Sequence, residues 1–117
     1  SDYYSYGMGF WAPKASLMEA YRRGIDSDPA ALEKLVRKFN KQDVFQLYGP
    51  EYARKKGETT KLLTPWYNRK SINIQHELPP DERIFQPELA QDIIDGFDAL
   101  MPLYKYFDAL CAQTDSQ

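Results

Sequence analysis

The last part of the chain carries an apolar pattern that holds helical spacing over several turns. Its residues are Leu89, Ile93, Phe97, Leu100, Tyr104, Phe107 and Cys111. Steps of three and four residues place side chains on one face of a helix. Pro102 lies inside the pattern, where a proline removes one hydrogen bond and costs about 3 kcal/mol. Because the pattern keeps its phase across Pro102, the sequence predicts one long helix that is kinked there and packs its apolar face on the rest of the fold.

Two segments alternate between apolar and other residues and predict strands. In residues 3–11, Tyr4, Tyr6, Met8 and Phe10 share one face, and Gly7 and Gly9 lie on the other. The two glycines leave a bare backbone surface that can receive either a closely packed helix or a ligand, the helix being the commoner case. Residues 71–78 alternate in the same way, with Ile72, Ile74, His76 and Leu78 on one face.

Two helices are expected between these strands. Pro13 suits a helix start, and the pattern that follows is expected to end near Gly24. Asp28 is a good N-cap and Pro29 a good first residue for the second helix. We therefore predict an α+β fold in which a short β-sheet packs against a helical hairpin and a Pro-kinked C-terminal helix. The 117 residues suit a single domain over 1–117.

Composition excludes several classes of protein. The chain is 43% hydrophobic and 27% charged, as globular domains are, and it has no apolar run of the roughly 20 residues that cross a membrane. No signal-peptide segment opens it, so we expect a cytoplasmic protein that does not bind membranes. Its single cysteine excludes an internal disulfide. The net charge of −2 makes nucleic acid an improbable partner.

Residues 51–70 differ from the rest because they combine six basic and two acidic side chains with aromatic ones. Arginine forks and lysine ammonium groups bind phosphates or carboxylates, and aromatic faces stack on rings and cations. The predicted ligand-binding residues are Arg54, Lys55, Lys61, Trp66, Tyr67, Asn68, Arg69, Lys70, Gly7 and Gly9. The simpler alternative is a solvated loop that Trp66 and Tyr67 anchor to the core. A small anionic ligand, nucleic acid and a protein partner are the other interpretations.

No residue pattern indicates catalysis or a cofactor. There is no glycine-rich phosphate loop and no serine in a nucleophile elbow. His76, the only histidine, has no ligand cluster around it and is expected to be a packed, hydrogen-bonded residue rather than a metal ligand. Cys111 extends the apolar helix face and is expected to be a buried structural thiol. We therefore predict no catalytic residue, no metal and no cofactor.

Six stretches stand in order along the chain: 6–13 (YGMGFWAP), 21–29 (YRRGIDSDP), 52–55 (YARK), 65–70 (PWYNRK), 85–89 (FQPEL) and 100–107 (LMPLYKYF). In these stretches the sequence resembles a bacterial family known as domain of unknown function 2461. The resemblance implies that the chain corresponds to the C-terminal half of a longer family fold. Many members have a basic Pro-Gly stretch that leads to Asp-His-Pro where this chain has 63–68 (LTPWYN). The family brings no established reaction and no catalytic residues.

These observations favour a non-enzymatic binding or interaction module that uses the basic-aromatic loop. The alternative is an enzyme acting on a small anionic substrate. That alternative requires Arg54 and Arg69 to share a cleft with a titratable group such as His76 or Glu77. Because two strands make a thin sheet with open edges, we also expect the chain to form a homodimer or to leave a strand edge exposed.

Overall fold

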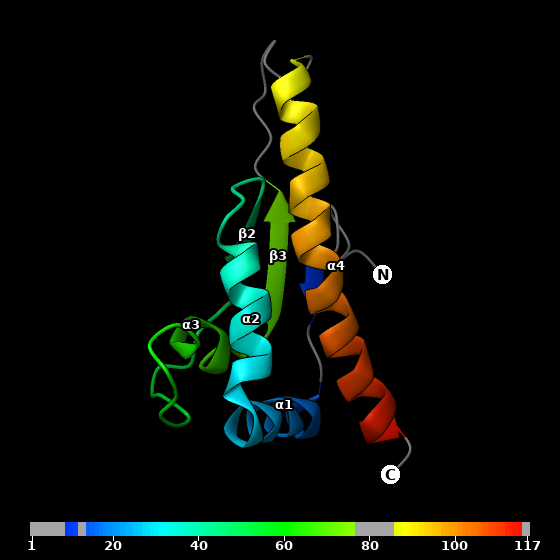
Figure 1. Cartoon of the computed structure of the whole chain (residues 1–117). Coiled ribbons are helices and arrows are strands. Elements are labelled where there is room, and N and C mark those ends of the chain that lie inside the picture. The colour runs from blue at the N-terminus through cyan, green and yellow to red at the C-terminus, as the bar shows by residue number, and fades with distance from the viewer. Residues whose placement is uncertain (1–8, 12–13, 77–85, 116–117) are drawn as a thin grey trace.

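A three-stranded antiparallel sheet forms one layer of the molecule, and helices cover one of its faces (Figure 1). The structure is a computed structural model that describes residues 9–11, 14–76 and 86–115, with side chains described within 14–76 and 86–112. The strands are β1 (Gly9–Trp11), β2 (Phe45–Tyr48) and β3 (Ile72–His76), in the order β1-β3-β2. The helices are α1 (Ala15–Ser27), α2 (Pro29–Phe39), α3 (Thr64–Tyr67) and α4 (Pro87–Asp115). The α+β class predicted from the sequence is confirmed.

The register of the sheet separates a buried face from a more open one. Ile72 and Ile74 of β3 are buried, and Phe45 and Leu47 of β2 pair with His76 and Ile74. Directly paired residues point to the same side of a sheet, so these side chains form the face that the helices cover. In β1, Gly9 pairs with Ile74 and therefore also lies on the covered side. This position favours the packed helix over a ligand at Gly9, while Gly7 lies outside the described residues.

Helices α1 and α2 follow one another with only Asp28 between them, and α1 lies across the lower end of α2, so the two helices meet at a corner instead of running antiparallel (Figure 1). The backbone N–H of Ala31 donates to Asp28 Oδ1 at 3.3 Å, so Asp28 caps α2 as expected. The prediction that the first helix ends near Gly24 is wrong, because α1 continues to Ser27. Gly24 lies where α1 meets α4, since a Cβ there would lie 3.6 Å from Tyr106 Oη. Gly24 therefore lies inside α1, at its contact with α4, and does not end the helix.

Helix α4 runs beside α2 and continues past Pro102, which kinks the helix without ending it (Figure 1). Its buried face is rotated from the predicted one. The buried residues of α4 are Gly96, Ala99, Leu100, Leu103, Phe107 and Leu110. The predicted core residue Phe97 is 40% exposed, because Gly96 instead faces the sheet and a Cβ there would lie 2.9 Å from the Phe45 ring. Tyr104 and Cys111 are half-buried.

The core joins all the described helices to the sheet. Its largest fully buried side chains are Tyr21, Met18, Ile25, Leu32, Leu63, Ile72, Leu100, Leu103 and Val36. Tyr21 from α1 donates a hydrogen bond from its hydroxyl to the Trp66 carbonyl at 2.9 Å, which ties α1 to α3. Burial raises the pKa of Tyr21 well above its ordinary value of 10. Among the described residues, no helix is both long and apolar enough to cross a membrane.

Candidate functional site

Short helix α3 lies inside the basic-aromatic loop of residues 51–70, and it carries two of the predicted ligand residues, Trp66 and Tyr67, into the core. Trp66 is 3% and Tyr67 5% exposed. The Trp66 ring packs edge-on against Phe39, with the ring centres 5.5 Å apart. The two side chains therefore anchor the basic-aromatic loop, which is the simpler alternative considered for them. Their rings are not open stacking surfaces.

Asn68, another predicted ligand residue, is 6% exposed and holds the loop in place. Its Oδ1 accepts a hydrogen bond of 2.7 Å from the backbone N–H of Lys56, and its carbonyl accepts one of 3.0 Å from Tyr52. Since a buried polar group must be hydrogen-bonded, these bonds explain an asparagine at this position. Asn68 thus positions the segment 52–56.

Arg69 is also committed to the fold. Its Nε donates to the Pro65 carbonyl at 2.9 Å and its Nη1 to the Gly49 carbonyl at 2.6 Å. Its Nη2 lies 3.3 Å from Glu51 Oε1, and an isolated β-bridge joins the same two residues. The guanidinium therefore closes the base of the loop. Of the predicted residues, Arg54, Lys55, Lys61 and Lys70 are exposed.

The enzyme alternative needs groups that the structure keeps apart. Arg69 precedes the first residue of β3, whereas His76 is its last residue. The five-residue strand between them rises by about 13 Å, so Arg69 and His76 lie beyond its two ends. Glu77 lies outside the described residues. Among the described residues, no group of three or more His, Cys, Asp or Glu side chains could hold a metal ion.

The structure assembles a different cluster where the loop meets helix α1. The Arg22 guanidinium carbon lies 5.4 Å from the centre of the Tyr52 ring, and the Lys56 ammonium nitrogen lies 4.7 Å from the same centre. Each cation is within the range of a cation–π contact. Because both distances are measured from the centre of the Tyr52 ring, the two cations lie within about 10 Å of each other. We call Arg22, Tyr52 and Lys56 the Tyr52 cluster.

The hydrogen bond between Tyr67 and Asp26 closes one side of this region. The Tyr67 hydroxyl donates to Asp26 Oδ2 at 3.2 Å, and Asp26 lies one helical turn after Arg22. Burial and then this bond to Asp26 raise the pKa of Tyr67, and the Arg22 charge opposes that rise. The backbone of Gly57 passes so close to Tyr67 that a Cβ there would lie 2.9 Å from the hydroxyl oxygen. Arg22 and Tyr67 thus share one electrostatic environment.

Sequence reasoning missed Arg22 because it lies on a helix far from the basic-aromatic loop along the chain. A signal was nevertheless present. Arg22 belongs to the stretch 21–29, and Tyr52 begins the stretch 52–55. Two of the stretches that carry the family resemblance therefore meet at the cluster. The spacing of residues within either stretch could not indicate that Arg22 contacts Tyr52, because the two stretches are far apart in the sequence.

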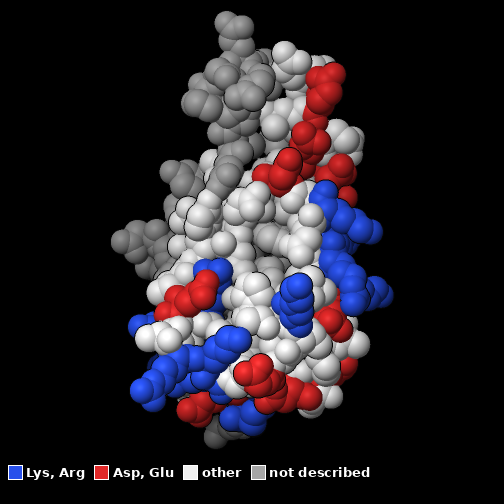
Figure 2. Space-filling view, turned by 90° about the vertical axis from the view of Figure 1, so that its left-hand side faces the viewer, with Lys and Arg blue, Asp and Glu red and all other residues white. Residues whose placement is uncertain are grey.

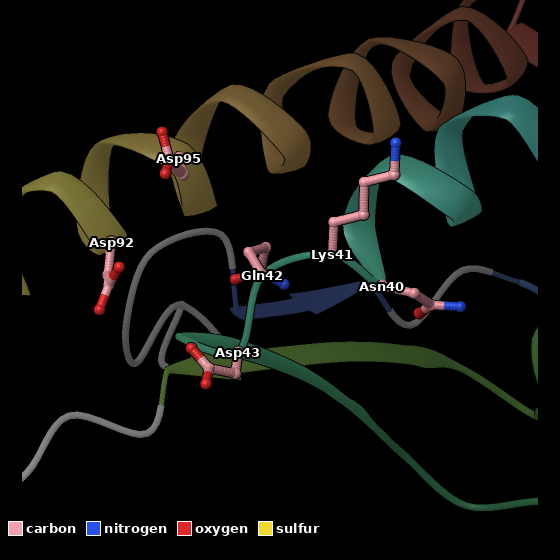
Figure 3. A pocket seen from close by; sticks show the side chains of 6 residues that line it. All are labelled: Asn40, Lys41, Gln42, Asp43, Asp92 and Asp95. Carbon is pink, nitrogen blue, oxygen red and sulfur yellow. The ribbon is translucent and has the colours of Figure 1, made fainter.

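A hollow lies away from the Tyr52 cluster, between α4 and the α2–β2 connection (Figure 3). Its volume is about 420 Å³, and its lining residues are Asn40, Lys41, Gln42, Asp43, Asp92 and Asp95. Figure 3 shows that the carboxylates of Asp92, Asp95 and Asp43 do not converge on one point. Asp95 instead accepts a hydrogen bond of 2.9 Å from Gln91 on its own helix. The arrangement is that of a solvated polar surface.

Comparison with known proteins gives one match. The model of the family described as "Conserved hypothetical protein (DUF2461)" matches residues 1–106. No curated protein and no solved structure matches the chain.

Proposed function

Because the chain belongs to the DUF2461 family of conserved hypothetical proteins, whose description includes no activity, we propose a function from the site itself. The protein is a binding module for a small anionic ligand, and the ligand contacts Arg22 and Lys56 of the Tyr52 cluster. This proposal keeps the basic-aromatic loop as the binding element and adds helix α1 to it.

One observation carries the proposal: two cations lie on one ring without a carboxylate partner in the described part of the chain. Arg37 and Arg69 are paired there with Glu33 and Glu51, but Arg22 and Lys56 form no such pair. In addition, Nη1 of Arg22 is buried and has no hydrogen-bond partner among the described residues. A buried donor that lacks an acceptor costs about 1–3 kcal/mol. An oxyanion bound beside Arg22 and Lys56 would neutralise the two like charges, and it would reach Nη1, which solvent does not, only if the Arg22 side chain moved.

The surroundings of the cluster also favour an anion. Arg54 and Lys55 on the loop are exposed and directly precede Lys56 in the sequence. Figure 2 shows basic side chains over the lower part of this side of the molecule, with acidic ones among them, while acidic side chains gather near its upper end. Asp26 accepts a hydrogen bond from Tyr67 and keeps its negative charge, which the cations Arg22, Arg54, Lys55 and Lys56 outnumber.

Calorimetric titration with pyrophosphate at low ionic strength tests the proposal. Arg22→Gln and Lys56→Gln should each weaken binding about tenfold or more, because a hydrogen bond to a charged group contributes about 1.5–3 kcal/mol. Arg23→Gln, which removes an exposed charge one residue away, is the matched control for Arg22. Lys34→Gln on the exposed side of α2 is the control for Lys56. Binding should also weaken as salt is added.

Two outcomes would contradict the proposal. One is the absence of any binding of phosphate, pyrophosphate or citrate by the wild-type chain. The other is an equal loss of binding in Arg22→Gln and Arg23→Gln. Since Arg22 packs on Tyr52, thermal unfolding of each variant must accompany the titration, and Arg22→Lys retains the charge if Arg22→Gln unfolds.

A further inference from the structure

The three aromatic side chains of the loop all have partners inside the protein. Trp66 packs edge-on against Phe39 in the core. Tyr67 is buried, bonds to Asp26 and lies under the backbone of Gly57. Tyr52 is half-buried and has two cations at its ring. A ligand base would therefore have to displace one of these partners before it could stack.

We infer that the Tyr52 cluster recognises the multiply charged phosphate end of its ligand, a di- or triphosphate group, without stacking on a nucleobase. The inference rests on the proposed function and names the ligand class for that same site. Recognition then depends on charge and hydrogen bonds, so the group attached to the phosphates contributes little.

The number and placement of the cations favour more than one negative charge on the ligand. Arg22 and Lys56 lie within about 10 Å of each other, so one compact polyanion can interact with both. Arg54 and Lys55 add two exposed charges directly before Lys56 in the chain. A single phosphate gains less from such a group, because Coulomb attraction grows with the charge of the ligand. An arginine fork also matches the geometry of phosphate oxygens.

The same features disfavour single-stranded nucleic acid. Proteins that bind it combine a basic groove with exposed aromatic rings on which successive bases stack, at about 1–3 kcal/mol per base. In the described part of this chain, the loop provides the charges, but its two rings in α3 are buried. An oligonucleotide would therefore bind only through its phosphates.

Calorimetric titrations of the whole chain separate the ligand classes. The ligands are inorganic phosphate, tripolyphosphate, ATP, citrate and a twelve-residue oligothymidylate. We expect tripolyphosphate and ATP to bind within about threefold of each other, and inorganic phosphate to bind at least about tenfold more weakly. Citrate and the oligonucleotide should bind more weakly than tripolyphosphate.

Removal of the ring tests recognition without stacking directly. In Tyr52→Leu, Arg22 and Lys56 lose the ring that both contact, so ATP and tripolyphosphate should lose affinity by the same factor. The factors should be equal because neither ligand stacks on the ring. Tyr48→Leu, at a tyrosine that is 40% exposed on β2, is the matched control and should change neither. A loss for ATP alone in Tyr52→Leu would overturn the inference.

The remaining outcomes are also decisive. ATP binding more than about tenfold tighter than tripolyphosphate, or tightest binding of the oligonucleotide, would overturn the inference while leaving an anion-binding module in place. Tighter binding of citrate than of tripolyphosphate would overturn the phosphate assignment in the same way. If no anion binds at all, the proposed function itself fails.

Discussion

Gly49 is the position where a single methyl group should disturb the base of the loop most. It follows β2 and has φ = 118°, a conformation that residues with a Cβ rarely adopt. Its carbonyl accepts the 2.6 Å hydrogen bond from Arg69. A Cβ at Gly49 would lie 2.6 Å from the carbonyl oxygen of Ser71, which is backbone and cannot turn aside. Gly49→Ala must therefore strain the residue itself and also shift the start of β3.

The size of the effect follows from these two contributions. A residue held in a sparsely populated backbone conformation costs of order 1–3 kcal/mol. The contact with Ser71 adds a further cost, because overpacking against fixed groups typically destabilises by about 1–3 kcal/mol. We expect Gly49→Ala to lower the free energy of unfolding by about 3 kcal/mol. That is a large part of the 5–15 kcal/mol that a typical domain has.

Gly24→Ala is the matched control, since it is the same substitution at a glycine with a different environment. In α1, the new Cβ would lie 3.6 Å from Tyr106 Oη and 3.8 Å from Leu110 Cδ2, which are ordinary contacts. Alanine is favoured over glycine in a helix interior by about 1 kcal/mol. Gly24→Ala should therefore raise the free energy of unfolding by up to about 1 kcal/mol.

Urea denaturation followed by circular dichroism measures both changes at equilibrium. The expected result is opposite shifts of the urea midpoint with similar m values. A free energy of unfolding for Gly49→Ala within about 0.5 kcal/mol of the wild-type value would refute the argument, because it would mean that neither the positive φ nor the Ser71 contact constrains the turn. Equal destabilisation by both substitutions would refute it as well, because the cost would then come from alanine in general.

Three further predictions follow from other parts of the molecule. Asp28→Ala should lower the free energy of unfolding by about 1 kcal/mol, measured by urea denaturation, because Ala31 loses its cap; no change would contradict the cap. Because the pKa of Tyr67 is raised in the folded protein, the unfolded chain loses the hydroxyl proton at a lower pH than the folded chain does. The contribution of Tyr67 to the free energy of unfolding is therefore fully present below about pH 10 and is lost as the pH rises through the folded pKa. Between pH 8 and pH 11, the free energy of unfolding should fall less for Tyr67→Phe than for wild type. An equal fall in both proteins would contradict the raised pKa of Tyr67. Sedimentation should show self-association that Tyr48→Lys weakens, because Tyr48 is 40% exposed on β2, an edge strand of the sheet, where a lysine disfavours pairing with a second edge; a compact wild-type monomer at all concentrations would contradict the expected homodimer.

Local sequence signals predicted the elements whose causes are local. Asp28 and Pro29 mark the start of α2, and both act within the first turn of that helix. The alternation in residues 71–78 predicted β3, which the structure describes as Ile72–His76. Helix α3, with four residues, is too short to display a helical period, so no pattern could indicate it.

The rotated face of α4 shows what a pattern of large residues cannot detect. The predicted face was chosen by its bulky apolar members and included Phe97. The sheet instead approaches α4 at Gly96, where the absence of a side chain admits the ring of Phe45. Phe97 then lies beside that contact, with its ring centre 5.1 Å from that of Phe45 and 40% of the residue exposed. A glycine that makes room for another residue has no hydrophobic signal of its own.

Composition located the basic-aromatic loop, but contacts between distant segments decide which of its residues are buried in the core and which stay at the surface. Trp66 lies in the core beside Tyr21 of α1 and Phe39 of α2. Tyr67 is held by Asp26 of α1 and by the backbone of Gly57. Tyr52 is left at the surface of α1, where Arg22 reaches it. Charge alone therefore predicted where an anion could bind, and packing decides which of the charged residues are free to bind it. Because Arg69 is used by the fold and Arg22 has no acidic partner in the described part of the chain, the arginine to substitute in a binding experiment is Arg22.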